Sequence, residues 1–202
     1  METVRKQILK CMIFVNVFML FRYGQQHVVE WGLIPSTERF SMSLVMDVFF
    51  LLLLAGFRCK MNAFCMGFSI ARNRKLFLVV MSIIVFPIAA SHFGNRQVLS
   101  SDIFFLLDAG FVSPALEEII YRGIVYQILR KCMAGWAALL LDSVLFSLGH
   151  SGIHELSCAF LFSCMAILLF ESTKSIWSPI FFHSGCNLME IFTPWEYISK
   201  IF

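Results

Sequence analysis

The most constraining feature of this 202-residue sequence is a succession of long apolar runs separated by short polar stretches. A helix that crosses a bilayer needs about 20 mostly apolar residues, which is more than a buried helix of a soluble domain requires. Because hydrophobic residues make up 59% of the chain and charged residues only 14%, an ordinary soluble domain is excluded. We therefore predict an all-α, polytopic helical membrane protein that forms one transmembrane domain over residues 1–202.

About seven spans are expected from the apolar runs and the polar residues between them. They cover residues 4–21, 40–57, 76–93, 103–129, 136–149, 156–170 and 176–192. The first run is followed by bulky polar residues rather than a small-residue cleavage site, so we expect it to remain as the first helix. Gly110 and Pro114 should interrupt the fourth span, and the basic segment 58–75 should lie along the membrane surface.

Basic residues are distributed unevenly between the loops. Those on the N-terminal side of the predicted spans are Arg5, Lys6, Lys10, Arg58, Lys60, Arg72, Arg74, Lys75, Arg130, Lys131 and Lys174, and those on the other side are Arg22, Arg39, Arg96 and Lys200. Cytoplasmic loops are enriched in lysine and arginine, so we predict a multi-pass cell-membrane protein with a cytoplasmic N-terminus. The bilayer is the expected partner, and the net charge of +3 gives no reason to expect nucleic-acid binding.

The richest group of ionisable residues within an apolar run is Glu117-Glu118-Ile119-Ile120-Tyr121-Arg122. On a helix, Glu118 and Arg122 lie four residues apart and can form an ion pair, whereas Glu117 projects about 100° away around the axis. Glu118 is then structural, and Glu117, left without a local cation, is the candidate general base. Alternatively, both acids complete a polar network that holds helices together.

Two further polar pairs lie in later apolar runs: Phe146 with His150, and His183 with Asn187, each four residues apart. His150 is either catalytic or a satisfied residue near a helix end. His183 and Asn187 share one helical face, so they could stabilise an oxyanion or bond neighbouring helices together. For Glu117 and His150 to share a water, the fourth span must be broken near Pro114 or the fifth must extend beyond Gly149.

Other protease classes are not indicated. The sequence has no G-x-S-x-G, G-x-G-D or H-E-x-x-H motif, and a metal site at His150 and His154 is not favoured because cysteine stands where a second zinc-binding histidine would be needed. The seven cysteines include no C-x-x-C pair and are expected to be reduced thiols. Cys186 beside His183 is a poor candidate nucleophile without an electropositive setting. No cofactor is expected.

Together, the motifs E-E-x-x-x-R, F-x-x-x-H and H-x-x-x-N, in this order on three apolar segments within residues 103–192, resemble the CPBP family, named for CAAX proteases and bacteriocin-processing enzymes. The resemblance implies a fold of the type II CAAX prenyl endopeptidase kind and peptide-bond hydrolysis without a covalent intermediate. By this resemblance, Glu117 and His150 activate the water and His183 and Asn187 hold the oxyanion. Glu118 and Arg122 then orient the site.

The resemblance leaves more than one function open. An intramembrane endopeptidase would cut a membrane-associated peptide or a lipidated protein C-terminus. A bacteriocin self-immunity protein or a membrane scaffold of the same fold would use the polar cluster for binding, but would not need a base together with an oxyanion site. A transporter is less favoured because the polar residues gather in three late segments without a matching pair of halves.

Overall fold

A computed structural model describes residues 2–27, 31–32, 39–57, 102–150 and 152–192, and the ordered elements in these ranges are all helical. They are α1 (Glu2–His27), α2 (Arg39–Phe57), α4 (Asp102–Leu107), η4 (Asp108–Val112), α5 (Ser113–Glu118), η5 (Ile119–Val125), α6 (Tyr126–Cys132), α7 (Gly135–Ser147), α8 (Ile153–Thr173) and α9 (Trp177–Phe192). The all-α prediction is thus confirmed for these residues. The predicted span 76–93 and the basic segment 58–75 lie outside them.

Six of the seven predicted spans coincide with helices, counting α4 to α6 as one continuous helix. Among the described helices, α8 is the one that is both long enough and apolar enough to cross a membrane alone, and the apolar stretches Ser41–Leu54 and Gly135–Ser147 are shorter. A chain with seven spans therefore remains a prediction. The first helix is longer than the predicted span 4–21, because α1 runs from Glu2 to His27.

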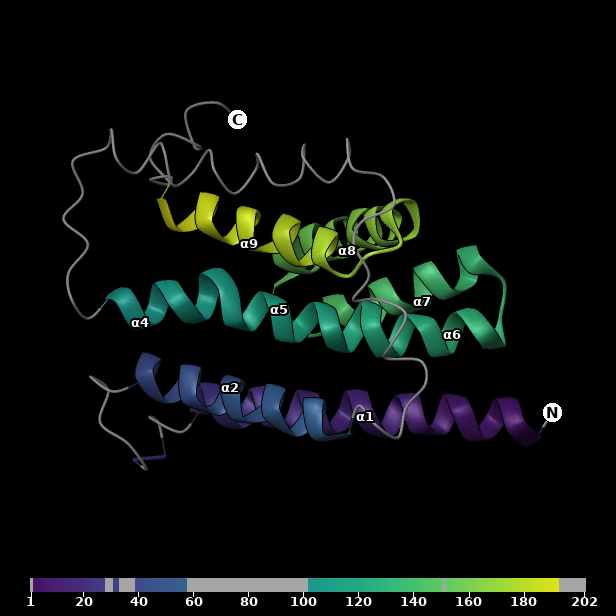
Figure 1. Cartoon of the computed structure of the whole chain (residues 1–202), viewed down its shortest axis with the longest axis horizontal. Coiled ribbons are helices and arrows are strands. Elements are labelled where there is room, and N and C mark those ends of the chain that lie inside the picture. Colours follow the sequence, from purple (N-terminus) through teal and green to yellow (C-terminus); the bar gives the residue numbers. More distant parts are fainter. Residues whose placement is uncertain (1, 28–30, 33–38, 58–101, 151, 193–202) are drawn as a thin grey trace.

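The continuous helix α4–α6 runs through the middle of the bundle (Figure 1). Helices α1 and α2 lie on one side of it, and α8 and α9 lie on the other (Figure 1). Helix α7 turns back after α6 and packs along α8. The helix that carries Glu117, Glu118 and Arg122 is therefore covered from both sides.

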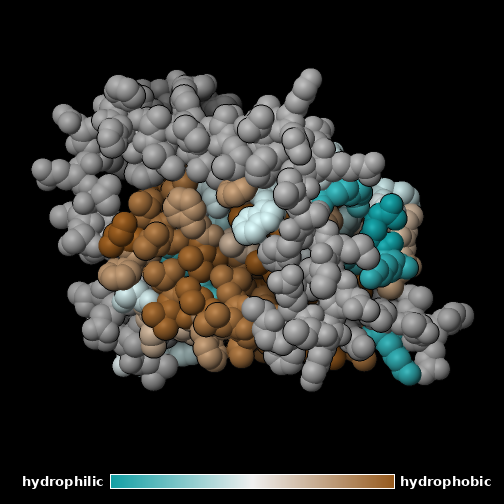
Figure 2. All heavy atoms as spheres, in the orientation of Figure 1, coloured by the Kyte–Doolittle hydropathy of each residue, from teal (hydrophilic) through white to brown (hydrophobic). Residues whose placement is uncertain are grey.

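Beside an apolar core, the bundle has exposed apolar side chains and buried charges. Large apolar side chains such as Leu20, Leu52 and Leu161 are exposed, while Asp47, Glu118, Arg122 and Asp142 are fully buried. Figure 2 shows one broad apolar face of this kind. Apolar groups that face outward and charges that face inward are the arrangement expected for a helical bundle surrounded by lipid.

The middle helix is wider than an α-helix at two places rather than interrupted, so the predicted break is wrong. The Ser113 N–H bonds to the Asp108 carbonyl and the Tyr126 N–H to the Tyr121 carbonyl, both five residues back. Such π-helical turns absorb a backbone irregularity without ending the helix. The first of these turns lies directly before Pro114, which has no N–H to donate to the helix.

The start of α1, the turn between α6 and α7 and the turn between α8 and α9 all lie at one end of the bundle (Figure 1). The end of α6 carries Arg130 and Lys131, and Lys174 follows α8. Helix α2 runs toward this end beside α4, η4 and α5, and α4 begins at the opposite end of the bundle (Figure 1).

This arrangement makes a prediction for the lysines. A membrane-impermeant amine reagent should modify the exposed Lys6, Lys131 and Lys174 only from the cytoplasmic face, and Lys200 only from the other face. Sealed vesicles of both orientations, digested and analysed by mass spectrometry, provide the measurement. Modification of Lys131 and Lys174 from opposite faces would contradict the placement of their two turns at the same end of the bundle. Modification of Lys200 from the same face as Lys6 would mean that the chain has an even number of spans rather than seven.

Candidate active site

A buried ion pair lies at the centre of the bundle. Glu118, the last residue of α5, and Arg122, one turn later in η5, are both completely buried, and Arg122 Nε is 3.2 Å from Glu118 Oε2. The guanidinium also donates to the Ser163 carbonyl of α8 at 3.3 Å. The pairing expected from the four-residue spacing is confirmed, and it connects the middle helix to α8.

The aromatic residue of the second motif packs directly on this pair. The Arg122 guanidinium carbon lies 4.6 Å from the centre of the Phe146 ring, an arrangement that stabilises a cation in a dry environment. Phe146 also meets Tyr121 edge to face at 5.1 Å and the His150 ring at 5.3 Å between centroids. Phe146 thus places the end of α7, and with it His150, against the helix that carries the glutamates.

His183 of α9 joins the two glutamates. Its Nδ1 is 2.9 Å from Glu118 Oε1, and its Nε2 is 4.0 Å from Glu117 Oε2. A carboxylate only accepts hydrogen bonds, so the proton of this short contact belongs to Nδ1 of His183. The opposite ring nitrogen therefore faces Glu117.

Glu117 has a cationic partner, which contradicts the prediction of an unpaired carboxylate. Arg22 of α1 donates from Nη2 to Glu117 Oε1 at 3.0 Å, and Ser113 Oγ donates to the same oxygen at 3.2 Å. The residues lie 95 positions apart in the sequence. No helical spacing could have revealed this contact, although Asp47 in the second apolar run did require a partner and Arg22 also pairs with it at 3.2 Å.

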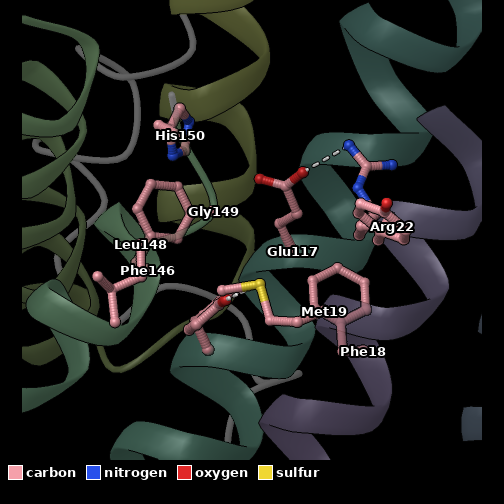
Figure 3. A pocket seen from close by; sticks show the side chains of 10 residues that line it. Phe18, Met19, Arg22, Glu117, Phe146, Leu148, Gly149 and His150 are labelled. Atoms are coloured by element: carbon pink, nitrogen blue, oxygen red, sulfur yellow. Dashed lines mark hydrogen bonds and ion pairs between the residues drawn. The ribbon is translucent and has the colours of Figure 1, made fainter. Parts of the chain in front are cut away.

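Glu117 and His150 line one cavity of about 360 Å³, together with Phe18, Met19, Arg22, Tyr23, Tyr121, Phe146, Leu148 and Gly149. Figure 3 shows the Glu117 carboxyl group between the Arg22 guanidinium and the His150 ring, with Phe18, Met19 and Phe146 around them. Neither of the expected rearrangements is needed, because α7 ends at Ser147 and the turn after it carries His150 back to the middle helix.

Asn187 makes a bond between helices, which is one of the two roles expected for it from the sequence. Its Nδ2 donates to the Ala109 carbonyl at 2.7 Å. In the π-helical pattern that binds Ser113 to Asp108, the next donor would be Pro114, which has no N–H, so the Ala109 carbonyl lacks a helical partner. One N–H of the Asn187 amide donates to this carbonyl, and the amide has a second N–H that can donate elsewhere. Neither Asn187 nor His183 is among the described residues that line the cavity.

Metal binding has no support from the described residues, among which no three histidine, cysteine, aspartate or glutamate side chains gather in a way that could hold an ion. Cys186 is a free thiol in α9. The arrangement instead offers one carboxylate and one imidazole at a shared cavity, with a second imidazole beside the carboxylate. Such a set can remove a proton from water and return it to a leaving group.

The bond between Asn187 and Ala109 can be tested through its dependence on Pro114. Asn187→Ala should lower the free energy of unfolding by about 1–3 kcal/mol, because the partly buried Ala109 carbonyl loses its donor. In a Pro114→Ala background the restored N–H can serve that carbonyl, so the same substitution should cost about 1 kcal/mol less. Thermal unfolding in detergent measures the four proteins, and equal costs in both backgrounds would refute the assignment.

Comparison with known proteins agrees with the motifs. Residues 99–189 match the family described as Type II CAAX prenyl endopeptidase Rce1-like. A Bacillus subtilis (strain 168) protein named "Putative membrane peptidase YdiL" is 33% identical over 82 residues, which are 41% of this chain and 34% of that protein. The chain thus matches about a third of the length of this relative. No solved structure matches. The resemblance to this group of membrane proteases is confirmed for residues 99–189, an Rce1-like segment that carries all three motifs.

Proposed function

We propose that this chain is an intramembrane endopeptidase that hydrolyses a peptide bond in a membrane-associated peptide or protein C-terminus. The observation that carries the proposal is that Glu117 and His150, which come from different motifs, line the same cavity. The Rce1-like match and the printed name of the Bacillus relative support a membrane protease of this general kind. A multi-pass position in the cell membrane, with the N-terminus in the cytoplasm, belongs to the same proposal.

In this reaction Glu117 is the general base. Its Oε1 is occupied by Arg22 and Ser113, so Oε2 is the oxygen that takes a proton from water. His150 orients the same water across the cavity, and the resulting hydroxide attacks the carbonyl carbon of the substrate. The tetrahedral intermediate collapses when the proton held by Glu117 passes to the leaving amine, so no covalent enzyme intermediate forms.

The oxyanion is held by His183 and Asn187. Because His183 Nδ1 donates to Glu118, its Nε2 can donate to an oxyanion only when the ring carries both protons. Asn187 contributes the N–H that the Ala109 carbonyl leaves unused.

The cavity indicates what kind of residue the substrate presents. Its walls include Phe18, Met19, Phe146 and Leu148, and its volume of about 360 Å³ lies near the lower end of small-molecule sites. Such a site suits one or two apolar side chains next to the bond that is cut. A peptide already dissolved in the bilayer, or held there by a lipid, is therefore the expected substrate.

The test compares purified full-length wild type with Glu117→Gln in detergent or bilayer, against a pool of membrane-associated peptides. New termini are identified by mass spectrometry, with a chelator in a parallel sample. Loss of the base should reduce kcat by about 10²- to 10⁴-fold without unfolding the protein. Glu190→Gln, the same change at an exposed glutamate of α9, is the matched control and should retain wild-type activity.

Three outcomes would count against the proposal. Full activity of Glu117→Gln would show that the base is assigned wrongly. Activity that disappears with chelator would favour a metal mechanism. The third outcome is that the wild type cuts no peptide, and that cells that carry Glu117→Ala behave like cells that carry the wild type. In that case a self-immunity or scaffold protein of the same fold would become the better explanation.

A further inference from the structure

Arg22 and Asp47 lie in α1 and α2, outside the Rce1-like segment 99–189, yet Arg22 contacts the candidate base directly. We propose that Arg22, held in place by Asp47, is a positioning residue that fixes the Glu117 carboxyl group with Oε2 toward the cavity. This inference rests on the proposed function of Glu117 as a general base. The two terminal nitrogens of the Arg22 guanidinium donate to different groups, one toward Glu117 and the other toward Asp47.

One edge of the guanidinium serves Glu117. Arg22 Nη2 donates to Glu117 Oε1 at 3.0 Å and to Ser113 Oγ at 2.9 Å, and Ser113 Oγ donates to the same carboxylate oxygen at 3.2 Å. The three groups form a closed triangle around Oε1. Rotation of the carboxyl group would break two of these bonds, so Oε2 is the oxygen left for a proton.

The other edge of the guanidinium is anchored. Arg22 Nη1 donates to Asp47 Oδ2 at 3.2 Å and to Gln25 Oε1 at 3.1 Å. Gln25 in turn donates to Asp47 Oδ1 and to the Ser43 carbonyl at 3.3 Å. Asp47 is completely buried and Gln25 nearly so. Because a guanidinium is planar and rigid, fixing one edge sets the position of the other.

The contact is poised to affect the reaction rather than only the fold. The Glu117 side chain is 15% exposed and belongs to the cavity wall, whereas the Asp47 side chain is 0% exposed and does not. Asp47 therefore needs Arg22 as a buried counter-charge, and Glu117 needs it for orientation. Misplacing a reacting group by about 1 Å can cost 10²-fold in rate.

The experiment separates these two needs. Arg22→Met alone would leave Asp47 buried without a counter-charge and could prevent folding. Combining it with Asp47→Asn removes both charges and keeps an oxygen that can accept from Gln25. Glu117 and Asp108 still lose the attraction of Arg22, so the double variant should be less stable than the wild type but more stable than Arg22→Met alone. Its kcat should fall about 10- to 100-fold with little change in KM. Full-length protein and a peptide cut by the wild type are used.

Two further variants complete the design. Arg22→Lys keeps the charge, but an ammonium group lacks the planar fork, so kcat should fall with little change in unfolding temperature. Arg130→Met is the control, because it makes the same substitution at an arginine of α6 that pairs with Glu171, away from the cavity. Glu171 keeps Tyr126 and Lys174 as partners, so this variant should leave kcat unchanged.

Each result has one meaning. The inference would be overturned if the folded double variant had the wild-type kcat while Glu117→Gln was inactive. If the double variant fails to fold, a wild-type kcat in Arg22→Lys would overturn it in the same way. A wild type that does not differ from Glu117→Gln would instead refute the proposed function, and this inference with it. A lower kcat in stable Arg22 variants would support the positioning role.

Discussion

The buried ion pair between Glu118 and Arg122 is the contact on which the other features of the site depend. Both side chains are fully buried, and placing two charges in such a position is costly unless each has further partners. Arg122 finds them in the Ser163 carbonyl and the Phe146 ring, and Glu118 finds one in His183. These partners come from α8, α7 and α9. These contacts form only when all three helices pack against the middle one.

This requirement also gives two adjacent glutamates different surroundings. Glu118 faces the inside of the bundle, whereas Glu117, rotated around the helix, faces α1 and the cavity. One carboxylate then holds helices together, and its neighbour is available for chemistry. The π-helical turns on either side of α5 belong to the same arrangement. The first lies directly before Ser113 and Pro114, and the second contains Arg122.

The sequence predicted the features that depend on local spacing. It identified the apolar helices and the Glu118–Arg122 pair because a helix repeats every 3.6 residues. It could not identify the contact between Arg22 and Glu117, which joins residues far apart in the chain. It also assigned Asn187 only as an oxyanion donor or a link between helices, because the acceptor at Ala109 arises from a π-helical turn that no residue pattern marks. Phe146 was recognised as part of a motif, but its contact with Arg122 depends on how α7 folds back.

Part of the cavity lining comes from the first helix, which lies outside the Rce1-like segment. Phe18, Met19, Arg22 and Tyr23, all on α1, line the cavity together with Glu117 and His150. Residues 99–189 therefore carry the three motifs without enclosing the space between them. The guanidinium of Arg22 contacts both Glu117 and Asp47 of α2, so among the described residues α2 reaches the cavity only through Arg22. The three motifs therefore share their cavity with side chains of α1, even though the sequence of that helix showed little more than hydrophobicity.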